Sequence, residues 1–200
     1  MTTTPSEAKM TFSARITKGS SEALLTAVER HAHHGVERVR LAVDTEGGEV
    51  ASAMILYSTL SSMGPELVTH NTHEVASMGI VLFLAGDRRI ASPEAEFFLH
   101  PITIEVPAGW KTAARSLDLN EMRDLRTKVE RSGGHPKMLA ELDWGGIRLE
   151  REERAVRTVL EQRTKLTRSE IEAVVQRSEP VDAEYAKAVG IVHDVSAPGL

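Results

Sequence analysis

A serine and a histidine carry the chemistry that this sequence suggests. Ser77 belongs to the segment, residues 76–79, that opens an apolar stretch at residues 80–85, and this stretch predicts a buried helix. A hydroxyl at the first turn of such a helix lies among unpaired backbone N–H groups and the positive end of the helix dipole. That environment stabilises negative charge on oxygen. His100 follows an apolar strand-like run, residues 97–99, and could take a proton from a serine. The alternative is that Ser77 only caps the helix.

Two glycines form a second candidate element of a site. Gly47 and Gly48 follow a run that predicts a strand, residues 38–43, and precede a helical pattern, residues 50–63. The carboxyl end of a strand is where open α/β sheets place their chemistry. A Gly-Gly pair there lets the backbone approach a substrate carbonyl without a Cβ in the way. The alternative is an ordinary strand-to-helix turn.

The elements around these residues alternate between strand and helix. A helix with an apolar stripe, capped by Ser20 and ended by Gly35, is expected before the strand at 38–43. After the helix at 50–63 come a short strand at 67–69 and a polar loop at 70–74. This alternation predicts an α/β fold of βαβ units with a largely parallel sheet.

Three segments together resemble the proteolytic subunit of Clp protease, a serine peptidase family with the ClpP/crotonase fold. They are TEGGEV at residues 45–50, ASMG at 76–79 and FFLHP at 97–101. The resemblance implies that Ser77 is the nucleophile and His100 the base, with the amides of Gly48 and Met78 as the oxyanion hole. It covers residues 39–101 closely and 148–195 more loosely.

The third catalytic residue departs from the family pattern. Asp182 and Asp194 fit the frame of the family's C-terminal motif, and counting back from Asp182 puts Ser178 at the position of the acid. Glu179 is the next residue and is the candidate acid if the loop shifts by one position. Otherwise Ser77 and His100 work as a dyad. His73, where the family usually has glycine, is expected on the loop surface beside the nucleophile.

The resemblance also implies a division of the chain. Residues 1–10 are expected to form a mobile tail, with a strand at 12–17. Residues 11–104 and 147–196 form a ClpP-like core of stacked βαβ units, whose long charged helix at 147–165 is the handle. Residues 105–146 form an extra helical insertion: a helix with an apolar stripe at 117–129, a break at 132–136 and a second short helix.

Composition excludes several classes of function. The chain has 200 residues, a net charge of -5 and no cysteine, which argues against nucleic-acid binding and excludes disulfides and Cys-ligated zinc. His31, His33 and His34 are read as a solvated helix end, so no metal and no cofactor is expected. No apolar run reaches the length of a membrane span, no secretory signal is visible, and a cytoplasmic location is expected.

Three functions are compared. The first is a serine endopeptidase that cleaves peptides or unfolded proteins inside a homo-oligomeric ring, with an AAA+ unfoldase as partner. The second is an inactive or regulatory paralogue that fills positions in such a ring, favoured by Ser178 and His73. The third is an acyl-CoA enzyme of the wider crotonase fold, which does not need the Ser–His pair and is ranked last. We therefore predict the peptidase.

Overall fold

The computed structural model describes residues 6–106 and 115–197. The chain forms two compact units, one of residues 1–100 with 159–200 and the other of residues 101–158. The second unit therefore contains the expected insertion together with the first part of the expected handle helix.

The first unit is built on a sheet that is parallel along its main path. The strand order is β1-β2-β3-β4-β9, and every neighbouring pair on this path is parallel. β5 adds to β3 in parallel, and β8 pairs with β5 in antiparallel. This confirms the predicted α/β fold. The strands are β1 (Glu7–Phe12), β2 (Arg38–Thr45), β3 (Glu66–Ala76), β4 (Arg88–Ala91), β5 (Glu96–Phe98), β8 (Pro180–Asp182) and β9 (Asp194–Val195).

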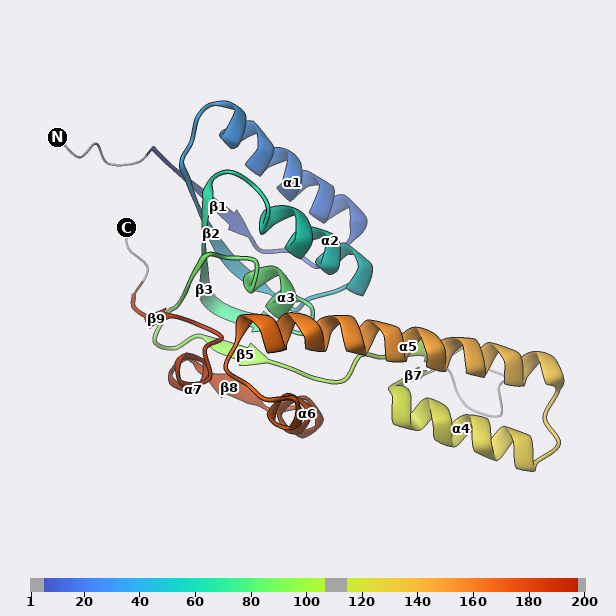
Figure 1. Cartoon of the computed structure of the whole chain (residues 1–200). Coiled ribbons are helices and arrows are strands. Elements are labelled where there is room, and N and C mark those ends of the chain that lie inside the picture. The colour runs from blue at the N-terminus through green and yellow to red at the C-terminus, as the bar shows by residue number, and fades with distance from the viewer. Residues whose placement is uncertain (1–5, 107–114, 198–200) are drawn as a thin grey trace. The chain divides into compact units, whose positions relative to one another are not determined.

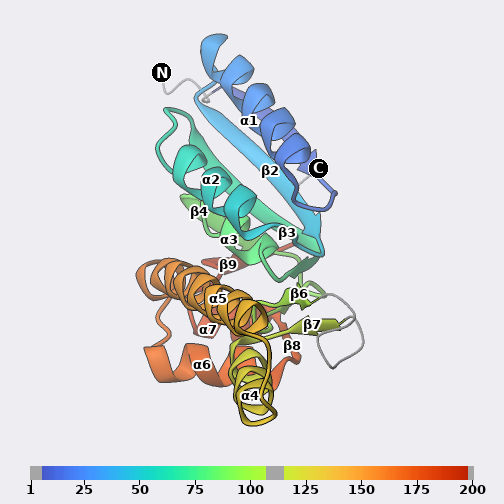
Figure 2. The same cartoon turned by 90° about the vertical axis from the view of Figure 1, so that its right-hand side faces the viewer.

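Two helices, α1 (Lys18–His33) and α2 (Val50–Leu60), lie side by side over one face of β1 to β3 (Figures 1 and 2). β2 alternates along its length, so that Val39, Leu41 and Val43 are fully buried. The cap of α1 is Thr17, whose hydroxyl accepts from the Ser20 amide, and not Ser20 as expected. Gly35 ends the helix with φ 74°, as predicted.

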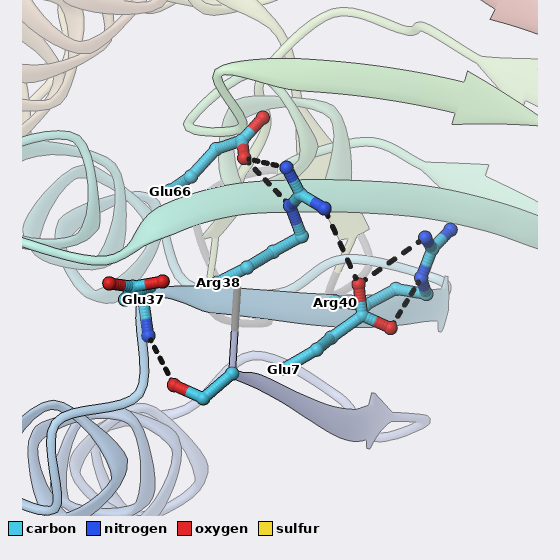
Figure 3. Close-up of polar contacts among 6 residues, drawn as sticks. Glu7, Glu37, Arg38, Arg40 and Glu66 are labelled. Carbon is cyan, nitrogen blue, oxygen red and sulfur yellow. Dashed lines mark hydrogen bonds and ion pairs between the residues drawn. The ribbon is translucent and has the colours of Figure 1, made fainter. Parts of the chain in front are cut away.

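The arginines of β2 alternate with these buried residues and form ion pairs across three strands (Figure 3). Arg38 binds Glu66 of β3 at 2.6 Å, and both Arg38 and Arg40 pair with Glu7 of β1. The aliphatic stems of such arginines cover apolar sheet surface while their charged ends reach water. The sheet is therefore polar at this position, and the ion pairs, being partly exposed, contribute little to stability.

The N-terminal expectations were wrong for residues 7–17. Residues 7–10, expected in a mobile tail, belong to β1, which pairs in parallel with β2 from Glu7↔Arg38 to Phe12↔Val43. The strand ends at Phe12, so it does not occupy residues 12–17. Alternation of buried Ala8 and Phe12 with exposed polar residues carried too weak an apolar signal to reveal the strand. Residues 1–5 of the expected tail lie outside the described residues.

The polar loop expected at residues 70–74 is part of β3, which corrects the prediction. His70 and Asn71 are buried. They are tolerated because they are hydrogen-bonded: the His70 ring bonds with the Ser92 hydroxyl at 3.1 Å, and Asn71 Nδ2 donates to the Glu96 carbonyl at 2.8 Å. Burial, and the positive charge of Arg40, lower the pKa of His70 below its usual value. These long-range partners are invisible in a local reading of the sequence.

Arg89 of β4 joins segments that are far apart in the chain. Its guanidinium donates to the carbonyls of Gly86, Arg163, Gly190 and Ile191 at 2.8–3.2 Å. Burial, and the positive charge of Arg163, lower its pKa to about 10. Arg163 itself donates to the carbonyls of Leu84 and Gly86, just after α3 (Gly79–Phe83). The two arginines thereby satisfy helix-end carbonyls that have no partner within the helix. The C-terminal helices nearby are α6 (Arg168–Arg177) and α7 (Ala183–Ala188).

The second unit consists of a two-stranded antiparallel sheet and two helices. Its elements are β6 (Ile104–Val106), β7 (Arg115–Leu117), α4 (Leu119–Arg131) and α5 (Pro136–Arg163), of which residues 159–163 belong to the first unit. Its core contains Leu117, Met122, Val129, Leu142 and Leu149. The strands β6 and β7 were not predicted.

Helix α5 corrects the expected division of residues 137–165 into two helices. It runs without interruption through Gly145 and Gly146. A Cβ built on Gly145 would lie 3.3 Å from the Met122 methyl, so the lack of a side chain lets α4 approach closely. Packing against α4 therefore offsets the low helix propensity of two glycines. Beside this contact, β6 and α5 line a cavity of about 490 Å³ that includes Trp144.

The described residues contain neither a membrane-spanning helix nor a cluster of metal ligands. No helix in residues 6–106 or 115–197 combines the length and apolar character that crossing a bilayer requires. The same part of the chain contains no group of three or more His, Asp or Glu side chains placed to hold a metal ion.

Candidate functional site

Ser77 lies at a sharp turn between a strand and a helix. β3 ends at Ala76, α3 begins at Gly79, and Ser77 has a φ of 52°. Its amide donates to the Phe98 carbonyl at 2.7 Å, and its carbonyl accepts from Ile80 at 3.1 Å. The residue is half-buried. Ser77 therefore lies in a turn just before the helix, and backbone hydrogen bonds to its amide and to its carbonyl hold this turn in place.

The positive φ of Ser77 is unfavourable for a residue with a side chain. A left-handed residue other than glycine costs about 1–2 kcal/mol and persists when the surrounding structure imposes it. Serine nucleophiles of other hydrolase folds stand on strained strand-to-helix turns of this kind, because the turn exposes the hydroxyl. A plain helix cap would have extended backbone, so the geometry favours the chemical reading of Ser77 over the cap.

Gly47 lies against the backbone of this turn. A Cβ built on it would be 2.7 Å from the Ala76 carbonyl oxygen and 2.8 Å from the Met78 nitrogen. Its φ is 91°, which side chains rarely adopt. Glycine is therefore required here by the packing of the protein itself. The approach of a substrate, which the sequence suggested, is not the only reason.

Gly48 contacts a different segment, the residues after β1. It forms a parallel bridge with Ile16, whose amide donates to the Gly47 carbonyl at 2.7 Å and whose carbonyl accepts from Glu49 at 2.9 Å. A Cβ on Gly48 would lie 2.1 Å from the Ile16 oxygen. The bridge fixes the turn from both sides and uses the carbonyl of Gly47 and the amide of Glu49, but not the amide of Gly48.

Two backbone amides close to the contact between Gly47 and Ser77 lack an internal partner in the described chain. Among the described residues, neither the Gly48 amide nor the Met78 amide donates a hydrogen bond to another part of the chain. Buried N–H groups are nearly always paired, so such donors call for an explanation. Two free amides near a serine can hold the negative oxygen of a tetrahedral adduct. These are the two donors that the resemblance implies.

His100 leaves the same edge of the sheet as Ser77. β5 runs parallel to β3 with Ala76 opposite Phe98, so both residues follow the carboxyl ends of neighbouring strands. His100 is half-buried, and its ring stacks near that of Phe98, with centroids 5.5 Å apart and planes 30° apart. Ser77 and His100, 23 residues apart in the sequence, therefore follow the ends of two paired strands.

The acid position lies on the other side of β5. β8 pairs with β5 in antiparallel, with Phe98 opposite Pro180. The pairing ends there, and His100 and Ser178, which is the position that the sequence motif gives for the acid, each lie two residues beyond this pair. Ser178 is exposed with φ 50° and donates to the Val175 carbonyl at 3.1 Å. Glu179 is also exposed, and no described residue forms a hydrogen bond or ion pair with its carboxylate.

Sequence reasoning missed two polar residues that support the site. Asn71 joins the start of β5 to β3 through its bonds to the Glu96 carbonyl and the His73 amide. Thr45, at the end of β2, accepts from the Gly47 amide at 3.1 Å. A signal for Thr45 was present, since a threonine two residues before a glycine often forms such a turn. His73 is exposed, although it lies on β3 and not in a loop.

Comparison with known proteins places this arrangement in a family. A sequence model of Clp protease matches residues 5–132, more than half of the chain. The chain belongs to the Clp protease family. A structure of a ClpP1 point mutant from Listeria monocytogenes superposes with a TM-score of 0.72, covering 94% of this chain and 91% of that one. The two sequences are 16% identical, so this match shows a shared fold. The family model ends at residue 132, so Ser178, which the sequence motif gives as the acid position, lies beyond the residues that it matches.

Proposed function

We propose that the chain is a serine endopeptidase in which Ser77 attacks the carbonyl carbon of a peptide bond. One observation carries the proposal: a serine with φ 52° stands beside two amides, Gly48 and Met78, that donate no internal hydrogen bond in the described chain. Membership in the Clp protease family supports the same chemistry. An acyl-CoA enzyme would need the two amides but gives no reason for the strained serine and the histidine on the next strand.

The reaction follows from these positions. His100 takes the proton of the Ser77 hydroxyl as its oxygen bonds to the carbonyl carbon, and the carbonyl oxygen becomes negative. The amides of Gly48 and Met78 donate to that oxygen. The C–N bond then breaks, and His100 returns the proton to the leaving amine. Water, deprotonated by His100, hydrolyses the acyl-serine and regenerates the hydroxyl.

The oligomeric assembly and the partners of the enzyme are proposed from its membership in the Clp protease family. We expect copies of the chain to form a ring that encloses the site, with peptides or unfolded proteins as substrates. An AAA+ unfoldase would then deliver folded substrates. No metal or cofactor enters the proposed reaction, because a histidine base and two amides supply proton transfer and charge stabilisation.

Labelling by a fluorophosphonate tests the proposal directly, since the reagent phosphonylates an activated serine. We expect wild type to be labelled at Ser77 and to hydrolyse a small fluorogenic peptide. Ser77→Ala should abolish both reactions, and His100→Ala should abolish hydrolysis, because an unactivated serine is a weak nucleophile. Both variants should keep the wild-type assembly mass. Comparable turnover in either variant would overturn the assignment.

An inactive subunit of a ring is the second candidate. The observation that favours it is Ser178, a serine at the position where the sequence motif has the acid. Without an orienting acid the histidine loses much, though not all, of its catalytic effect. An assembled wild type that neither reacts with fluorophosphonate nor hydrolyses peptides would favour this candidate.

A further inference from the structure

Thr45 touches both segments that carry the free amides. It is the last residue of β2 and is 5% exposed. Its hydroxyl contacts the turn of Gly47 and Gly48, while its methyl faces the first residue of α3. We infer that Thr45 is a positioning residue that sets the separation of the Gly48 and Met78 amides. The inference rests on the proposed function.

The hydroxyl of Thr45 fixes the glycine turn. It donates to the Ala14 carbonyl at 2.6 Å and accepts from the Gly47 amide at 3.1 Å. One hydroxyl has one donor and two acceptor sites, so both bonds form at once. The turn lacks side chains of its own and has φ values of 91° and 151°, so such anchors restrict it. The Ala14 contact also positions the segment that leads to Ile16.

The methyl of Thr45 fixes the other amide. A Cβ built on Gly79 would lie 2.6 Å from Thr45 Cγ2. The Gly79 backbone, one residue after Met78, therefore packs directly on this methyl. Thr45 also pairs with Val75 across the β2–β3 ladder, at the end of β3. The side chain acts as a spacer between the glycine turn and the start of α3.

Threonine is the residue type that makes both contacts. Valine keeps the methyl and loses the hydroxyl, serine keeps the hydroxyl and loses the methyl, and alanine loses both. In Thr45→Val the Gly47 amide and the Ala14 carbonyl lose their partner, so the turn can move by a fraction of an ångström. Oxyanion donors act over a narrow range of distance, which makes catalysis sensitive to such movement.

The test compares turnover with binding of a mimic of the tetrahedral adduct. We expect Thr45→Val to lower kcat by roughly tenfold, less than the loss of about a hundredfold or more on removing a donor outright. KM should stay within about twofold, because the carbonyl of the bound substrate interacts with the two amides more weakly than the transition state does. A peptide boronic acid, which forms a tetrahedral adduct with an active serine, should lose affinity by the same factor as kcat. Thr45→Ser, which keeps the hydroxyl and loses the methyl, should lose less kcat and boronate affinity than Thr45→Ala, which loses both.

A buried threonine elsewhere gives the matched control. Thr69 is fully buried, and its hydroxyl donates to the Phe83 carbonyl at 2.9 Å, at the opposite end of α3. Thr69→Val should lower the unfolding temperature while kcat and boronate affinity stay at wild-type values. If Thr45→Val does not fold, Thr45→Ala serves instead and should lose at least as much activity.

The outcomes separate the two proposals. Wild-type kcat and boronate affinity in Thr45→Val, or equal losses in Thr69→Val, would overturn the role of Thr45 and leave the peptidase standing. A wild-type chain that hydrolyses no peptide and takes up no fluorophosphonate would contradict the peptidase and the role of Thr45 with it. A drop in kcat without a matching drop in boronate affinity would also count against positioning of the amides.

Discussion

Ser77 holds a left-handed conformation that a side chain makes unfavourable. Glycine has no such penalty. The free energy of unfolding of Ser77→Gly should therefore exceed that of Ser77→Ala by about 0.5–1 kcal/mol. Both variants should lack hydrolysis. Urea unfolding of the two variants measures the difference. Equal stability would mean that the turn relaxes once the serine hydroxyl is gone.

Ser178 provides the control for that comparison, because it has nearly the same φ, 50°, at an exposed helix end. Ser178→Gly should stabilise the chain by a similar amount relative to Ser178→Ala. If the glycine and alanine variants differ in stability only at position 178, the left-handed backbone of Ser77 carries no strain.

The orienting acid is a second question at the scale of single residues. If Glu179 orients His100, Glu179→Gln should lower kcat by orders of magnitude and Ser178→Ala should change it little. If neither variant changes kcat, Ser178→Asp becomes decisive. Aspartate tolerates left-handed backbone, so the helix end can accept it. A rise in peptide hydrolysis would show that the acid position is intact, whereas an unchanged rate would show that it is too far from His100.

At the scale of elements, the β–α alternation was predictable from local periodicity. Strand β2 shows strict alternation, and α2 shows helical spacing followed by Gly64 and Pro65. The residues from His70 to Glu74 resisted prediction because burial of polar side chains depends on distant partners such as Ser92 and Glu96. The antiparallel addition of β8 to β5 also depends on pairing between residues about 85 positions apart, which no local pattern reveals.

The glycines of α5 allow a prediction about that helix. Gly146 has open space where a Cβ would be, so Gly146→Ala should raise the unfolding free energy of the chain by about 0.5–1 kcal/mol. Gly145→Ala should gain less, or lose stability, because its Cβ would press on Met122 at 3.3 Å. Urea unfolding of both single variants tests this. Equal gains would mean that α4 and α5 separate at this position in solution.

At the scale of the whole molecule, the second unit carries two exposed apolar side chains. Trp144 and Ile147 are each 67% exposed, and they lie three residues apart on α5, thus on one face of the helix. Apolar patches of this kind mark contacts with other molecules. We propose that this unit governs how rings associate, and expect Trp144→Lys with Ile147→Lys to lower the mass per assembly in light scattering.

Ile55 gives a comparison from the first unit, since it is 55% exposed on α2. Ile55→Lys should leave ring association unchanged if the second unit governs it. A double variant with wild-type mass, or a loss of mass in Ile55→Lys alone, would argue against the role of Trp144 and Ile147.

For the candidate site, the sequence suggested the reacting residues but not the side chains that support them. Ser77, His100 and the glycine pair were visible because their motifs are short and contiguous. Thr45 and Asn71 act by joining segments that are about 25–30 residues apart in sequence. Their roles depend on side-chain hydrogen bonds to particular backbone atoms, and those bonds become visible only with three-dimensional positions.

The hydrogen bonds of Arg89 can form only after the C-terminal part of the chain has been synthesised. Two of its carbonyl partners, Gly190 and Ile191, leave the ribosome about a hundred residues after it. Strand β8, which borders the strand before His100, is also translated late. A nascent chain that has not reached residue 180 has Ser77 but lacks the completed surroundings of His100. If the chain is the proposed peptidase, we expect hydrolysis to be delayed until synthesis is nearly finished, and released chains truncated after residue 178 should react more slowly with fluorophosphonate than the full chain.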